Sequence, residues 1–209
     1  MTMSCNHKRD NIEAFWNWFR DNKSIFEKID STNEDEKLDL ALEHLHTISD
    51  GLSIEISDEF NGVRDMVISP EGDKTKFEIV KEIVGQAPLL KGWTFTAFRQ
   101  PAQQDFTLQY NDIAFTPSEM FFYPKIDGDD LDLIIYSKDI RNHDYDIIAH
   151  YGLITMDNVL GEYDCVMKVR HYDFRDLDDE KDRTGLRPVT ELKAFIDKFY
   201  TMHHNKNGL

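Results

Sequence analysis

The sequence predicts an α+β fold in which helices cover one face of a mainly antiparallel sheet. Three observations support this prediction. Apolar residues recur at helical spacing near both ends of the 209-residue chain. Runs in which apolar and polar residues alternate, typical of half-buried strands, lie between them. The turns that separate the strands over residues 93–136 are too short to hold crossover helices, so we expect these strands to pair antiparallel.

The first predicted helix covers residues 10–30 and contains four aromatic side chains within the motif FWNWF. At the helical rotation of about 100° per residue, the apolar side chains fall within one arc of about 180°. Phe15 and Phe19 lie near the middle of this arc, and Trp16 and Trp18 lie at its margins. A face this wide suits packing across a sheet, so we expect both phenylalanines to be buried and both tryptophans to be partly exposed.

The next elements are predicted from caps, alternation and turns. Asn33 is the expected N-cap of a second helix, which runs to Gly51. The alternating run LSIEIS is joined by the Asn61-Gly62 turn to VRDMVIS, which predicts a β-hairpin. TKFEIVKEIVGQA, at residues 75–87, predicts a third helix that Pro88 ends.

The second half of the chain predicts strands followed by helices. Short β-rich runs over residues 93–136 indicate an antiparallel meander, with a turn at Asp127-Gly128-Asp129-Asp130. Residues 144–161 predict a long helix. EYDCVMKVRHYDF, at residues 162–174, is interpreted as a strand that buries Cys165. Thr190 is the expected N-cap of a closing helix.

No repeat, linker or composition shift divides the chain. We therefore predict a single domain over residues 1–209, with an ordered core over about residues 10–202.

The chain is strongly acidic, with 40 Asp and Glu residues against 24 Lys and Arg residues and a net charge of −16. This field repels nucleic acids and anionic membranes and favours basic partners, whereas solubility alone also explains it. No apolar run approaches the ~20 residues that cross a bilayer, and the polar start lacks a secretory signal. Two distant cysteines, Cys5 and Cys165, fit a reducing compartment, so a cytoplasmic location is predicted.

Two stretches, APLLKGWTFTAFRQP at residues 87–101 and ITMDNVLGEYD at residues 154–164, carry a resemblance. Together with the aromatic N-terminal helix, they resemble segments of small uncharacterised bacterial proteins. The resemblance implies a bacterial cytoplasmic origin. It implies no activity, because no part of it is a catalytic signature.

The sequence lacks the motifs of phosphate-binding loops, nucleophile elbows and zinc proteases. The spacing most typical of a metal site lies in NHDYDIIAH. His143, Asp146 and His150 occupy positions i, i+3 and i+7, which on a helix would share one face. Such nitrogen and oxygen ligands suit zinc, manganese or iron. The alternative interpretation is that these residues form only the polar edge of the helix.

Two classes of function follow. The favoured one is a non-catalytic protein of the immunity or regulatory type, which needs no cofactor and binds a basic protein through an acidic surface. The acidic loops DGDDLD and RDLDDEKDRTG supply the charge. The candidate contact residues are Asp127, Asp129 and Asp130, with Trp16, Trp18 or Phe122 as apolar anchors. The alternative is a small metal-assisted enzyme that uses His143, Asp146 and His150. The oligomeric state is not predicted.

Overall fold

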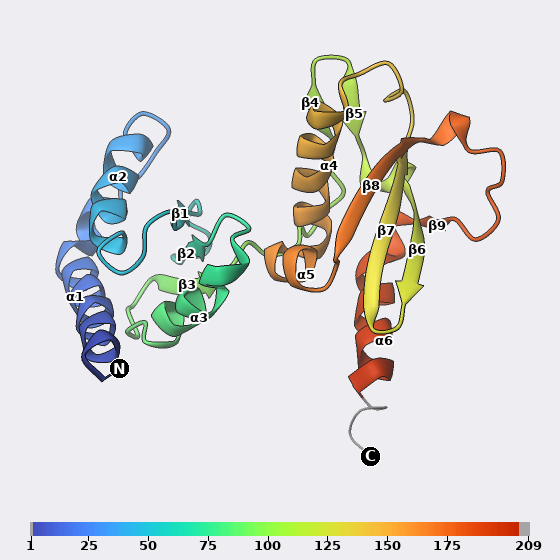
Figure 1. Cartoon of the computed structure of the whole chain (residues 1–209). Coiled ribbons are helices and arrows are strands. Elements are labelled where there is room, and N and C mark those ends of the chain that lie inside the picture. The colour runs from blue at the N-terminus through green and yellow to red at the C-terminus, as the bar shows by residue number, and fades with distance from the viewer. Residues whose placement is uncertain (1, 205–209) are drawn as a thin grey trace. The chain divides into compact units, whose positions relative to one another are not determined.

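The computed structural model describes residues 2–204, and the side chains of residues 8–202, as an α+β fold (Figure 1). It divides into two compact units, unit 1 (Met1–Arg99) and unit 2 (Gln100–Leu209), in place of the single domain expected over residues 1–209. Each unit has a sheet of its own. Unit 1 has 19 acidic and 12 basic residues and unit 2 has 21 and 12, so composition does not mark the boundary.

Unit 1 combines three helices with a three-stranded sheet. Its elements are α1 (Thr2–Phe26), α2 (Glu34–Leu45), β1 (Ser53–Ile56), β2 (Arg64–Ser69), α3 (Phe77–Gly85) and β3 (Trp93–Ala97). The predicted hairpin is confirmed, because β1 pairs antiparallel with β2. The prediction that residues 93–97 belong to an antiparallel meander is wrong. Helix α3 provides a crossover, and β3 pairs parallel with β2.

The aromatic face of α1 is buried more completely than predicted. Phe15 and Phe19 are 1% and 0% exposed, which confirms their place in the core. Trp16 is only 4% exposed, so the expectation of partial exposure is wrong for this residue. Its indole nitrogen donates to the carbonyl of Ile83 at 2.8 Å, because the end of α3 covers this margin of the helix. Trp18 is half-buried as expected, with its ring stacked on His44 of α2.

Unit 2 combines a four-stranded sheet, a small hairpin and three helices. Its elements are β4 (Leu108–Tyr110), β5 (Ile113–Phe115), β6 (Phe121–Asp127), β7 (Asp130–Ser137), α4 (Tyr145–Leu160), α5 (Glu162–Met167), β8 (His171–Asp176), β9 (Arg187–Pro188) and α6 (Leu192–His204). The sheet has the order β8-β7-β6-β9. Strands β6 and β7 form the predicted hairpin, whereas β7 and β8 are parallel.

Two predictions near the end of the chain are wrong. The first half of the expected strand over residues 162–174 is helix α5, because Gly161, with a φ of +79°, redirects the chain into a second helix. Cys165 is buried as expected, but on α5. Helix α6 begins at Leu192 after a 3₁₀ turn whose N-cap is Pro188, so Thr190 does not cap it.

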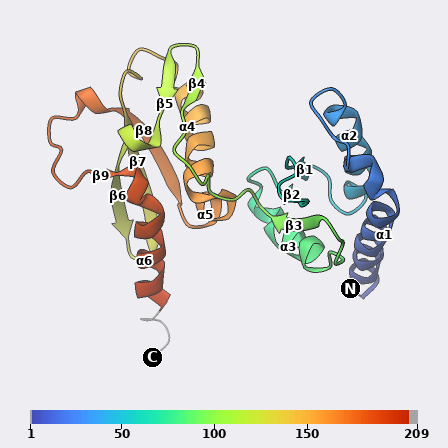
Figure 2. The same cartoon turned by 180° about the vertical axis from the view of Figure 1, so that it is seen from behind.

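The two faces of the unit 2 sheet are covered differently. Leu131, Leu133 and Ile135 of β7 pack into the core with residues of α4, α5 and α6, so helices cover one face as predicted (Figures 1 and 2). Ile134 and Tyr136 point to the opposite face, where they pack with residues of the segment that follows β8. None of the helices described is long and apolar enough to cross a membrane.

The units share a topology that the sequence does not reveal as a repeat. In each unit the chain forms an antiparallel hairpin and then a helical segment. The strand that follows pairs parallel with the second strand of the hairpin. The second hairpin strand ends at Ser69 in unit 1 and at Ser137 in unit 2. Two residues later each chain segment has an acidic residue with positive φ, Glu71 at 51° and Asp139 at 59°. The carboxyl ends of the parallel strands are therefore comparable places in the two units.

Candidate functional site

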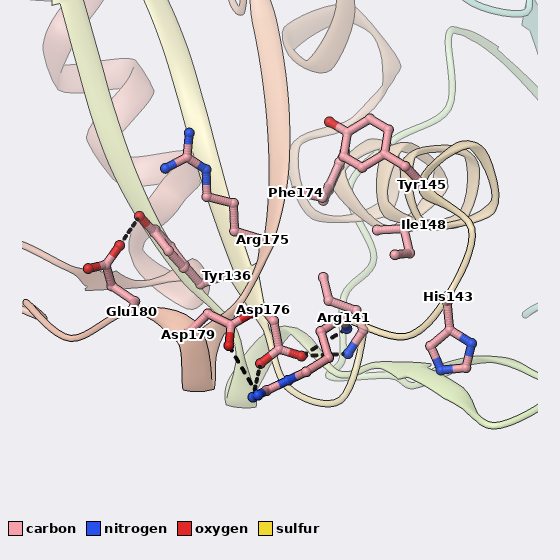
Figure 3. Close-up of a pocket in the computed structure, with 11 residues that line it drawn as sticks. Tyr136, Arg141, His143, Tyr145, Ile148, Phe174, Arg175, Asp176, Asp179 and Glu180 are labelled. Carbon is pink, nitrogen blue, oxygen red and sulfur yellow. Dashed lines mark hydrogen bonds and ion pairs between the residues drawn. The ribbon is translucent and has the colours of Figure 1, made fainter.

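A pocket of about 470 Å³ lies at the carboxyl ends of β7 and β8 in unit 2 (Figure 3). Because these strands are parallel, the chain leaves both at the same edge of the sheet, through residues 138–144 and residues 177–186. In sheets with parallel strands, this edge is the usual place for a ligand. Aromatic side chains of Tyr136, Tyr145 and Phe174 line the pocket beside charged groups.

The carboxylate of Asp176 connects the two loops at this edge. It accepts hydrogen bonds from the backbone nitrogens of Ile140 and Arg141 at 2.9 and 3.0 Å, and from that of Asp178 at 2.9 Å. Nη2 of Arg141 also donates to it, at 3.0 Å. Burial raises the pKa of Asp176, but these hydrogen bonds outweigh burial and leave the pKa below its usual value. Asp176 is therefore an ionised anchor for both loops.

Carboxylates offset the charge of both arginines in the pocket. Arg141 lies 3.0 Å from Asp179, measured from Nη1 to Oδ1, in addition to its contact with Asp176. Arg175 holds one oxygen of Asp173 with Nη2 at 2.7 Å and Nε at 2.8 Å. Hydrogen bonds to Asp176 and Asp173 raise the pKa of Arg141 and Arg175, respectively. An anionic ligand would have to displace these carboxylates.

Glu180 is held in the pocket by hydrogen bonds and not by an arginine or lysine side chain. Its Oε2 accepts a hydrogen bond from the Tyr136 hydroxyl at 2.9 Å, and its Oε1 accepts one from the backbone nitrogen of Asp182 at 3.1 Å. Burial, and then Glu180 itself, raise the pKa of Tyr136, so the phenol stays protonated and donates. Among residues 8–202, no basic side chain forms an ion pair with Glu180. Its negative charge remains available to a ligand.

The pocket as a whole is negative. Three carboxylates line it, Asp176, Asp179 and Glu180, and the guanidinium groups of Arg141 and Arg175 leave a net charge of −1. Of the aromatic residues that line the pocket, Tyr145 is 49% exposed and can contact a cation through its ring face, whereas Tyr136 and Phe174 are buried. This combination suits an ammonium or guanidinium group better than an anion.

The residues of the predicted metal site do not converge. Asp144 is the N-cap of α4, so His143 precedes the helix and does not share its spacing. Nε2 of His143 lies 3.8 Å from Oδ2 of Asp112, whereas Asp146 and His150 are exposed on the helix. Within the part of the chain described, no group of three or more His, Cys, Asp or Glu side chains is arranged to hold a metal. The metal-site prediction is therefore wrong.

The acidic turn predicted to bind a partner lies at the far end of β7 from the pocket. Asp127, Asp129 and Asp130 are exposed there, at the tip of the β6–β7 hairpin. Nη1 of Arg170 lies 2.6 Å from Asp130 and 3.9 Å from Asp127, so part of the charge is offset. Phe122 is 0% exposed within the core and cannot serve as the apolar anchor, which corrects that prediction.

Arg170 also controls the ionisation of Asp132, and this gives a testable prediction. Hydrogen bonds from Arg170, and to a smaller extent from His171, lower the pKa of Asp132 from 3.8 to about 2. We expect Arg170→Ala to raise this pKa toward its ordinary value. At pH values above the ordinary pKa of a carboxyl group, the pair of Arg170 and Asp132 makes its full contribution to the stability of unit 2. This contribution is lost as the pH falls through about 2. NMR titration of the Asp132 carboxyl carbon measures the shift.

The matched control for this titration is Lys181→Ala, which removes a cation from the loop after β8. It should leave the pKa of Asp132 unchanged. An equal rise in both variants would show that general charge, and not the Arg170 contact, lowers the pKa.

Sequence reasoning found only part of this site. The acidic loop RDLDDEKDRTG includes Arg175, Asp176, Asp179 and Glu180 and was expected to face a partner. Tyr136 and Arg141 carried no signal of their own, because their place depends on the parallel pairing of β7 with β8.

The sequence matches no protein-family model. Comparison with curated proteins and with solved structures found no match either.

Proposed function

We propose that the protein is a non-catalytic binding protein whose unit 2 engages a basic protein partner at the carboxyl edge of β7 and β8. The observation that carries the proposal is Glu180, a carboxylate in a pocket whose lining has a net charge of −1, with which no basic side chain among residues 8–202 forms an ion pair. A lysine or arginine side chain of the partner would approach Glu180 beside the hydroxyl group of Tyr136.

The charge of the whole unit supports the same kind of partner. Unit 2 has 21 acidic residues against 12 basic residues. Such a field raises the rate at which a basic protein meets this surface, and salt lowers that rate. Charge contributes mainly to the association rate and to specificity, whereas a buried apolar anchor provides most of the affinity. The pocket therefore accounts for recognition of a basic group.

A peptide titration tests the pocket directly. The probe is a Gly-Ser decapeptide with three arginines, compared with the same peptide carrying glutamine in their place. We expect the arginine peptide to perturb backbone NMR signals of residues 136–145 and 173–182, more strongly in about 0.03 M salt than in 0.3 M salt. Glu180→Gln should weaken its binding about fivefold, which corresponds to about 1 kcal/mol.

The matched control is Asp129→Asn, which removes the same charge at the opposite end of β7. It should change the affinity less than twofold. Equal weakening by both variants would mean that the peptide responds only to net charge, and the pocket would be rejected as its site. Equal binding of the glutamine peptide would reject recognition of a cation.

A further inference from the structure

Arg175 is positioned near two carboxylates, Asp173 and Glu180. Residues two apart on a strand lie on the same face of the sheet, so Asp173 and Arg175 of β8 are neighbours on one face. Arg175 is also the register partner of Tyr136 on β7, and the hydroxyl of Tyr136 donates to Glu180 (Figure 3). One carboxylate thus lies beside Arg175 on its own strand, and the other is bound to the tyrosine next to it.

Arg175 contacts the first of these carboxylates. Its Nε donates to Oδ2 of Asp173 at 2.8 Å, and its Nη2 lies 2.7 Å from the same oxygen. Two donors on one charged acceptor make a strong, charge-assisted contact. Among the side chains that the structure describes, no ion pair joins Arg175 to Glu180. Asp173 therefore holds the guanidinium group away from Glu180.

The guanidinium group of Arg175 nevertheless lies near the hydroxyl of Tyr136. Burial, and then Glu180, raise the pKa of Tyr136, whereas the positive charge of Arg175 acts in the opposite direction to a smaller extent. The hydroxyl oxygen lies 2.9 Å from Oε2 of Glu180. The side chain of Arg175 is 47% exposed and has several rotatable bonds, so without Asp173 it could turn past the hydroxyl to Glu180.

We propose that Asp173 is a positioning residue of the pocket, which holds Arg175 and so leaves Glu180 open to a cation of the partner. The inference rests on the proposed function for the role of Glu180. An arginine of the chain itself that paired with Glu180 would occupy the place of the partner's cation and would offset the charge that attracts it. Asp173 acts through Arg175 and does not need to touch the partner.

Titration with the arginine decapeptide tests this role in the full chain. Asp173→Asn keeps the shape of the side chain but removes the charge that holds Arg175, which we then expect to pair with Glu180. This variant should bind the peptide about fivefold more weakly than the parent chain, as expected for Glu180→Gln. Adding Glu180→Gln to Asp173→Asn should cause no further loss, because Glu180 is already occupied.

The matched control combines Asp173→Asn with Arg175→Gln. This double variant has the net charge of the parent chain, because one negative and one positive group are removed together, and it has no guanidinium group to occupy Glu180. We expect it to bind within about twofold of the parent chain. Weak binding by the double variant would overturn the inference. A loss in Asp173→Asn no larger than that in Asp129→Asn would overturn it as well, because general charge would then explain the loss.

A second measurement needs no peptide and separates this inference from the proposal for the pocket. In Asp173→Asn, a guanidinium group paired with Glu180 offsets the charge that helps to raise the pKa of Tyr136, so this pKa should fall. NMR titration of the Tyr136 ring measures the change, and the double variant should show no fall. If Glu180→Gln leaves peptide binding unchanged, the pocket proposal fails, but the titration still shows whether Asp173 keeps Arg175 from Glu180. An unchanged pKa of Tyr136 in Asp173→Asn would refute that role.

Discussion

Phe19→Ala is expected to lower the free energy of unfolding of unit 1 by about 3–5 kcal/mol. Phe19 is 0% exposed. The centre of its ring lies 5.3 Å from that of Phe26, 5.1 Å from that of Trp93 and 5.6 Å from that of Phe95. Removing the ring leaves a cavity at the point where α1 meets β3. Aromatic contacts with edge-to-face geometry are lost as well.

Tryptophan fluorescence during urea unfolding measures this loss selectively. The chain has three tryptophans, Trp16, Trp18 and Trp93, and all lie in unit 1. The matched control is Arg20→Ala, which removes an exposed neighbouring side chain and should change the free energy of unfolding by less than about 0.5 kcal/mol. A loss below about 1 kcal/mol in Phe19→Ala would contradict its central place in the core.

Asp176→Ala is expected to destabilise the carboxyl edge of unit 2 by about 3 kcal/mol. The Asp176 side chain is 1% exposed. Its loss leaves the backbone nitrogens of Ile140, Arg141 and Asp178 without their acceptor, at a place where water has little access. Arg141 is 42% exposed and can be hydrated, so its ion pair adds little to this cost. The two loops of the pocket would separate.

Amide hydrogen exchange in β7 and β8 measures this effect, because unit 2 has no tryptophan to report its unfolding. Exchange near the pocket should accelerate in Asp176→Ala and, to a smaller extent, in Asp176→Asn, which keeps an acceptor but loses the charge. The control Asp178→Ala keeps its backbone donor to Asp176 and should exchange like the parent chain. Unchanged exchange in Asp176→Ala would refute the role of this carboxylate.

The pH dependence of the Asp176 contribution follows from its pKa. Burial raises this pKa, but the hydrogen bonds outweigh burial and lower it below the value in the unfolded chain. The stabilisation is therefore complete above the ordinary carboxyl pKa and is lost as the pH falls through the pKa of the folded state. The exchange difference between the parent chain and Asp176→Ala should narrow under those acidic conditions.

Several features of this protein were determined by the sequence alone, because they depend on residues close together in the chain. Apolar spacing placed Phe15 and Phe19 in the core of unit 1. Turn residues placed both hairpins, since Asn61, Gly62 and Gly128 adopt the positive φ that a tight turn requires. Alternation and helical spacing together predicted the α+β class.

Tertiary structure alone decided the features on which the candidate site depends. The parallel pairing of β7 with β8 joins strands separated by α4 and α5, and no local pattern specifies such a distant partner. The same holds for Trp16. Its burial depends on α3, whose residue Ile83 lies 67 residues further along the chain and accepts the hydrogen bond of the indole. The pocket and the division into two units both depend on contacts between residues far apart in the chain. A local sequence pattern does not specify these contacts, because the burial and the charge environment of a residue depend on the distant segments that pack against it.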